Sequence, residues 1–203
     1  MRLLKRFFWL LLFLPLCAFA KEKPIIILDP GHGGKDQGAR VRNLEEKILT
    51  LRTSYLTKKH LEELGYRVIL TRAKDIFLPL GTRVGLANRR DISIFVSIHY
   101  NSAASPLAKG IEVYYYSKGK QQRREKSKQL ATSVLNQTIG QTKAKSRGIK
   151  QGNYQVIRET TMPGILIEAG FLTNREEREL LATQTYLDKL AKGIAIGVHQ
   201  FAK

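Results

Sequence analysis

Cysteine is almost absent from this chain, which has only Cys17 among its 203 residues. A single thiol excludes an internal disulfide framework. Acidic residues are also scarce, with 17 Asp and Glu against 35 Lys and Arg. The formal charge of +18 falls by three, to +15, when Arg2, Lys5 and Arg6 are left out. This excess predicts attraction to polyanions such as anionic wall polymer, anionic lipid or nucleic acid, and the alternative is a merely soluble, lysine-rich surface.

Long apolar runs are also lacking, except at residues 7–16. A basic stretch precedes this run, and Ala18-Phe19-Ala20 after it matches a signal-peptidase site. Because a run of about ten residues is short for a bilayer, we predict that residues 1–20 are a cleaved signal peptide and that residues 21–203 form one domain. Cys17 would leave with the signal, which excludes thiol chemistry in the mature chain. A retained anchor and a lipoprotein lipidated at Cys17 are the alternatives, although Leu16 is bulky for lipoprotein processing.

The predicted export decides between possible partners. An exported protein is separated from the nucleic acid of the cytoplasm, so we expect no nucleic-acid partner. We expect association with an anionic wall or membrane, and this association should weaken as salt is added. A periplasmic location is favoured over secretion or another place in the cell envelope, and we expect a monomer.

Apolar periodicity divides the remaining chain into alternating strands and helices. Helices are predicted at 41–65, 80–90, 121–138 and 186–201, with a short one from residue 175. Strands are predicted at 25–28, 66–71, 92–99, 110–116, 154–158 and 164–168. This alternation predicts an α/β three-layer sandwich, in which a mostly parallel, twisted sheet of about six strands carries helices on both faces.

Polar residues follow or end three of these strands: His32, His99 and Glu168. The carboxyl ends of parallel strands meet at one edge of a sheet, so these side chains can converge. Glu46, in the helix after the glycine-rich loop, is a fourth candidate. Two imidazoles and a carboxylate form an open zinc set, which lowers the pKa of a bound water. A second carboxylate outside that set can move the proton of the water.

Each of these residues also has a purely structural interpretation. His32 could be a turn histidine bonded to backbone, and His99 could be a core histidine at the end of a strand. Glu46 could be an acidic residue that the helix dipole favours. Glu168 is the hardest to explain in this way, because a carboxylate among apolar neighbours is costly to bury without a cation. No short zinc signature such as HExxH supports the metal hypothesis.

A series of stretches in order resembles the zinc-dependent N-acetylmuramoyl-L-alanine amidases of the cell-wall hydrolase type, amidase type 3. The resemblance covers roughly residues 24 to 201, and its stretches are ILDPGHGGKDQGA, LEEKILTL, GYRVILTR, RVGLANRRDISIFVSIHYNSA, KGIEVYYY, RGIK and MPGILIEAGFLTNREE. It implies that His32, Glu46 and His99 bind Zn²⁺ and that Glu168 is the catalytic glutamate. Glu45 could be aligned with the ligand position instead of Glu46, but Lys47 after it favours Glu46.

The resemblance also implies a reaction. The family cleaves the amide between the lactyl group of N-acetylmuramic acid and the L-alanine of the peptidoglycan stem peptide, during wall remodelling or separation of daughter cells. Asn101 is a candidate substrate contact or a turn-forming residue, and Asp36, Arg72 and Arg83 are expected to be structural. Some family members cover the zinc with a long helical insertion. Residues 116–147 leave room for little more than one helix, so we expect an open site.

Two other functions fit parts of the pattern. A zinc peptidase that cuts within the stem peptide would use the same activated water. A basic protein that binds wall polymer or nucleic acid without catalysis would explain the charge, but it would not explain the intact set of candidate ligands.

Overall fold

The computed structural model describes residues 23–89 and 91–203. The predicted signal peptide at residues 1–20, which includes Cys17, therefore lies outside the described residues, as does Arg90 at the end of the predicted second helix. Across the described residues, none of the helices combines the length and the apolar character that crossing a bilayer requires.

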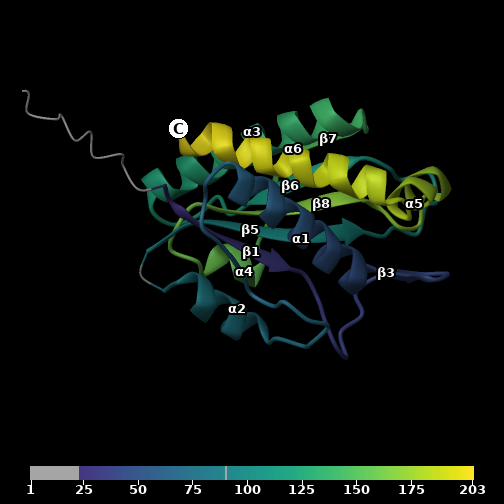
Figure 1. The fold of residues 1–203 in the computed structure, drawn as a ribbon, viewed down its shortest axis with the longest axis horizontal. Coiled ribbons are helices and arrows are strands. Elements are labelled where there is room, and N and C mark those ends of the chain that lie inside the picture. Colours follow the sequence, from purple (N-terminus) through teal and green to yellow (C-terminus); the bar gives the residue numbers. More distant parts are fainter. Residues whose placement is uncertain (1–22, 90) are drawn as a thin grey trace, which may run out of the picture.

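Within this part of the chain, six strands form one sheet in the order β4-β1-β5-β8-β6-β7 (Figure 1). Their bounds are β1 Ile25–Pro30, β4 Val68–Leu70, β5 Ile92–Asn101, β6 Ile111–Tyr115, β7 Ser146–Gln151 and β8 Gly164–Phe171. The first four strands in the sheet order are parallel to one another. β6 is antiparallel to β8 and parallel to β7. The carboxyl ends of β1, β5 and β8 consequently lie along one edge of the sheet.

Helices cover the two faces of the sheet unequally (Figure 1). The long helices α1 (Glu46–Glu63), α3 (Gln121–Thr142) and α6 (Gln184–Ala202) lie on one face. The short helices α2 (Leu80–Ala87) and α4 (Gln155–Arg158) lie on the other, and α5 (Arg175–Leu181) packs against β8 and α6. The prediction of a three-layer α/β sandwich with a mostly parallel sheet is confirmed.

The alternation of side chains along the strands decides which residues reach the less covered face. In β5, Val96 and Ile98 belong to the core under the long helices, whereas Phe95 packs on the side of α4. Because successive side chains of a strand point to opposite faces, His99 lies on the same side as Phe95. Glu168 likewise follows Leu166 by two residues and shares its face. α2 and α4 are too short to cover this face completely, and the candidate site lies there.

The structure corrects three predicted elements. Residues 41–45 form part of a small hairpin of β2 (Arg40–Val41) and β3 (Leu44–Glu45), so the helix predicted from residue 41 begins only at Glu46. Residues 155–158 form helix α4 rather than a strand, because five residues such as YQVIR are too few to distinguish the two periods. Strand β7 was not predicted, since SRGIKQ contains one aliphatic residue.

The segment between β6 and β7 contains one helix, α3, as the length of residues 116–147 predicts. α3 packs along α6 on the face opposite His99. The two helices approach closely at glycines of α6. A Cβ built on Gly197 would lie 2.5 Å from the Cα of Val134, and one on Gly193 would lie 2.5 Å from the Cα of Thr138. Backbone therefore packs directly against backbone in this layer.

This contact predicts opposite effects of the same substitution at two glycines. Gly197→Ala should lower the free energy of unfolding by about 1–3 kcal/mol, because its methyl group meets backbone that is unable to move aside. Gly140→Ala in α3 is the matched control: its Cβ would meet nothing within 4 Å, so alanine should stabilise the helix by up to about 1 kcal/mol. Urea denaturation measures both variants. Equal effects of the two substitutions would contradict the close contact.

Candidate functional site

His32 lies in a glycine-rich loop whose backbone is unusual. Its φ is 59°, in the left-handed region that side chains other than glycine seldom adopt, and Gly33 and Gly34 follow with φ of 131° and 58°. Backbone hydrogen bonds between Gly33 and Asp36 close the turn. Holding a histidine in this conformation costs of order 1–3 kcal/mol, and such strain is typical of functional loops.

Two other glycines of the loop let it pack directly on polar side chains. A Cβ on Gly31 would lie 2.3–2.7 Å from three atoms of the His99 ring. A Cβ on Gly38 would lie 2.5 Å from Oε2 of Glu46 and 2.6 Å from Cδ2 of His32. Any larger residue at either position would push these side chains apart, so glycine is required by space at both positions, and at Gly38 also by its φ of 64°.

Two buried arginine side chains bind the backbone of the glycine-rich loop. Arg72 donates to the carbonyl oxygens of Pro30 and Gly31 at 3.0 and 2.8 Å. Arg83 donates to Asp29 Oδ1 at 2.8 Å and to the carbonyl oxygen of His32 at 2.6 Å. The two arginine residues are 2% and 3% exposed, so their charges act on the loop almost without screening by solvent. Their predicted structural roles are confirmed.

Glu46 joins the two histidines at the edge of the sheet. Its Oε1 lies 3.0 Å from Nε2 of His32 and 3.0 Å from Nδ1 of His99. Its Oε2 accepts from the backbone N–H of Ala39 at 2.8 Å. The neighbouring Glu45 instead lies near Arg40 and Lys47, so Glu46, and not Glu45, faces the histidines.

The three side chains form a compact set of possible metal ligands. One atom from each of His32, Glu46 and His99 lies within 4.8 Å of the other two, and no other group of three or more His, Cys, Asp and Glu in the described residues is as close. Two imidazole nitrogens and one carboxylate oxygen match the ligands of open zinc sites. Nδ1 of His32 lies 2.9 Å from Oδ1 of Asp36, the kind of outer partner that orients a metal-binding histidine.

The charges of the cluster are mutually dependent. Burial by itself would raise the pKa of Glu46, but hydrogen bonds from His32 and His99 outweigh it and hold that pKa well below its usual range. Burial by itself would lower the pKa of His32, but Glu46 and Asp36 outweigh it and raise that pKa. Glu46 is therefore an ionised carboxylate, as a metal ligand must be.

Glu168 lies beside this cluster on the neighbouring strand. Its Cα pairs with that of His99 in the β5–β8 register. Its Oε2 is buried and has no hydrogen-bond partner among the described residues. Burial, together with the negative charges of Glu46 and Glu112, raises the pKa of Glu168 to about 7. A buried carboxyl oxygen without a partner has a high free energy, so the site is shaped to receive a further polar group there.

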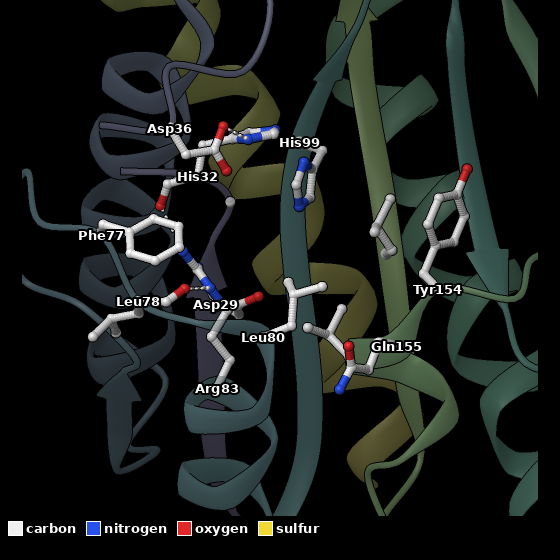
Figure 2. Close-up of a pocket in the computed structure, with 13 residues that line it drawn as sticks. Asp29, His32, Asp36, Phe77, Leu78, Leu80, Arg83, His99, Tyr154 and Gln155 are labelled. Carbon is white, nitrogen blue, oxygen red and sulfur yellow. Dashed lines mark hydrogen bonds and ion pairs between the residues drawn. The ribbon is translucent and has the colours of Figure 1, made fainter. Parts of the chain in front are cut away.

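A cavity of about 430 Å³ opens beside the two histidines. Figure 2 shows Phe77 and Tyr154 on opposite sides of it, with His99 between them and His32 near Phe77. Leu78, Leu80 and Val156 extend the wall, which is mainly apolar. The cavity therefore offers an apolar surface next to the polar cluster, an arrangement common in ligand sites.

Sequence reasoning missed a second polar cluster beside Glu168. Asn101 ends strand β5 instead of forming a turn, and its Nδ2 donates to Oε1 of Glu112 at 3.0 Å. Glu112 is 2% exposed and its Cα pairs with that of Glu168. The signal was present: in GIEVYYY the apolar residues alternate, which puts Glu112 on the face of the sheet away from the main core.

Comparison with known proteins decides the family. A model of the N-acetylmuramoyl-L-alanine amidases matches residues 26–200, nearly all of the described chain. This chain belongs to that family. The predicted resemblance is confirmed, and the matched range of the amidase family contains all four residues of the site, His32, Glu46, His99 and Glu168.

Comparison with individual amidases also supports membership of this family. The chain is 33% identical to N-acetylmuramoyl-L-alanine amidase AmiC of Neisseria meningitidis, over 89% of this chain and 53% of AmiC. It is 37% identical to the germination-specific N-acetylmuramoyl-L-alanine amidase of Bacillus subtilis, over 87% of this chain and 79% of that protein. The crystal structure of the amidase from Clostridium difficile 630 matches with a TM-score of 0.84 and 35% identity, over 89% and 97% of the two chains. The chain thus spans about half of AmiC and most of the other two.

The buried ion pair under the loop generates a stability prediction. Arg83→Met should lower the free energy of unfolding by about 3–5 kcal/mol, because it leaves the carboxylate of Asp29 buried without its cation. Adding Asp29→Asn to this variant should restore part of the loss, since the buried charge is then removed as well. Chemical denaturation measures both proteins.

Arg175→Gln provides the control. Arg175 pairs with Glu179 at 2.9 Å, close to the 2.8 Å between Arg83 and Asp29, but both side chains of the Arg175–Glu179 pair are exposed. The denaturation midpoint of this variant should stay unchanged. A loss as large as that of Arg83→Met would show that burial does not give the inner pair its importance.

Proposed function

We propose that this chain is a zinc-dependent N-acetylmuramoyl-L-alanine amidase that hydrolyses the amide between N-acetylmuramic acid and the L-alanine of the stem peptide. The observation that carries the proposal is the ligand set of His32, Glu46 and His99 beside the unpartnered carboxyl oxygen of Glu168. Membership of the amidase family supports the substrate and the bond.

Nε2 of His32, Oε1 of Glu46 and Nδ1 of His99 would hold the zinc ion, because these atoms converge. When bound, zinc supplies a Lewis acid that lowers the pKa of water and polarises the scissile carbonyl group. Asp36 fixes the ring of His32 by accepting from Nδ1, and Ala39 N–H fixes the carboxylate of Glu46. These contacts keep the ligands in place without help from the substrate.

Glu168 would transfer the proton. A carboxyl group with a pKa near 7 exchanges protons readily at neutral pH, which is the property that a general base and acid needs. Its free Oε2 can accept a proton from the attacking water. The same oxygen can then donate that proton to the nitrogen of L-alanine as the amide bond breaks.

We also propose the cellular setting of this reaction. Residues 1–20 would direct export and be removed, leaving the catalytic domain of residues 21–203 in the periplasm, with secretion as the alternative. The mature domain would act as a monomer on peptidoglycan in wall remodelling or daughter-cell separation. Its charge of +15 without Arg2, Lys5 and Arg6 supports electrostatic association with anionic wall or membrane.

Removing the proton-transfer group should separate catalysis from metal binding. Glu168→Gln should retain one zinc ion per chain, but its turnover should fall by about 10²–10⁴-fold, because an amide does not accept the proton. Mass spectrometry of digested muropeptides gives the readout: release of intact stem peptides and bare glycan identifies the amidase. Glu125→Gln, on α3 at the opposite face, is the control and should keep full activity.

Two results would contradict the proposal. Retained turnover by Glu168→Gln would remove this residue from the mechanism. Shortened stems still attached to glycan would identify a peptidase instead of an amidase.

The outer partner of His32 should tune metal affinity. Asp36→Ala should weaken zinc binding about 10–100-fold, because Nδ1 of His32 loses the carboxylate that orients the ring. Competition with a chromogenic chelator measures the dissociation constant. Asp188→Ala is a matched control, since Asp188 contacts His60 at 2.8 Å on helices away from the site. An unchanged zinc affinity of Asp36→Ala would refute the role of this contact.

A further inference from the structure

Glu112 is a buried carboxylate with more partners than its charge requires. Its Oε1 accepts from Asn101 and from the hydroxyl group of Tyr114, at 3.0 and 2.7 Å. Its Oε2 accepts from Nε of Arg147 at 2.6 Å and from Nζ of Lys150 at 2.5 Å. One negative charge is thus shared by two cations, and the cluster keeps an excess positive charge.

The two cations are held in place but remain accessible. Their side chains are 30% exposed for Arg147 and 37% exposed for Lys150, against 3% for Glu112. The guanidinium of Arg147 lies over the ring of Phe171 at 4.9 Å, and the ammonium of Lys150 lies 5.9 Å from the ring of Tyr114. Cations fixed in this way lose little conformational entropy when they bind an anion.

The cluster lies at the reactive edge of the sheet. Glu112 is level with Glu168 in the β6–β8 register, and β7, which carries Arg147, follows as the next strand. Neighbouring strands are about 4.8 Å apart, so the backbone at Arg147 lies roughly 10 Å from that at Glu168. The arginine side chain reaches back over part of this distance to meet Glu112.

We propose that Arg147 and Lys150, held by Glu112, bind the free carboxylate of an acidic residue that follows L-alanine in the stem peptide. This inference rests on the proposed function, because it takes the scissile amide to lie at His32, Glu46, His99 and Glu168. An extended peptide advances about 3.3–3.6 Å per residue. The group one residue beyond L-alanine therefore comes within reach of the two cations.

The cavity beside the histidines is consistent with this direction. It runs from Tyr154, whose ring packs edge-on against that of Tyr114, past His99 to Phe77, and it is mainly apolar. Its Phe77 end, away from the two cations, suits the uncharged rings and acetyl groups of the glycan better than a carboxylate. The substrate would thus lie with its sugar at the apolar cavity and its anionic peptide over β6 and β7.

Two muramyl dipeptides test the proposal. One carries a free carboxylate on the residue after L-alanine, and the other carries a carboxamide at the same position. Wild-type protein loaded with zinc should cleave the acid with a kcat/KM about tenfold higher than the amide, because a charge-assisted hydrogen bond is lost in the amide. Isothermal titration of the Glu168→Gln protein should give a similar ratio of dissociation constants without cleavage.

Variants locate the preference on the two cations. Lys150→Met and Arg147→Met should each bring the acid-to-amide ratio closer to one, and the ratio cancels any general loss of active protein. Lys150→Met leaves Arg147 on Glu112, so it tests the site even if Arg147→Met does not fold. Lys126→Met, which removes the same charge from the exposed face of α3, should keep the wild-type ratio.

The outcomes distinguish this inference from the proposed function. Cleavage of both dipeptides with a ratio near one would overturn the carboxylate site and leave the amidase intact. Failure to cleave either dipeptide would contradict the amidase, and the titration ratio would still decide whether the cations bind a carboxylate. A ratio that falls equally in Lys126→Met would assign the preference to overall charge.

Discussion

One carboxylate oxygen, Oε1 of Glu46, joins three parts of the chain that are distant in sequence. It lies 3.0 Å from a nitrogen of His32 in the glycine loop and 3.0 Å from a nitrogen of His99 at the end of β5. It also accepts from the backbone N–H of Tyr100 at 3.1 Å. The first turn of α1, the loop after β1 and the end of β5 are fixed relative to one another by this atom. The other parts of the site are arranged around it.

The unequal cover of the sheet explains why a polar cluster exists on this face. Three long helices bury one face, and the strands contribute aliphatic side chains to it. On the other face, α2 and α4 leave the ends of the strands free. Polar residues at His99, Glu112 and Glu168 can therefore meet there. Burial raises the pKa of Glu168, and the cavity beside His99 leaves room for a substrate.

Much of this arrangement could be predicted from the sequence. The fold class followed from the alternation of periods, and the meeting of His32, His99 and Glu168 followed from the parallel strands on which they lie. Residue-level reasoning alone left the role of Glu46 open, because helix position by itself also suits a residue that stabilises the dipole. The family resemblance separated it from Glu45, and the distances in the structure agree with that choice.

Other features could not be predicted from the sequence, because they depend on contacts between residues that are distant along the chain. The Glu112 cluster joins residues of β5, β6 and β7, and β7 itself has too little apolar character to be recognised as a strand. The left-handed φ of His32 is also unpredictable from residue type, since it is imposed by Asp36, Arg83 and the glycines around it. Position 154 was assigned to the wrong type of element, so its place in the cavity was missed.

β6 and β7 run against the other four strands, and this reversal has a consequence for evolution. It brings the beginnings of these two strands, instead of their ends, to the edge where the histidines lie. β7 is also an edge strand, and among the described residues it pairs with β6 alone. Insertions and replacements around the start of β7 can therefore alter this edge of the site while β5 and the loop after β1, which carry the histidines, stay unchanged. Selectivity and bond cleavage can diverge independently within one scaffold.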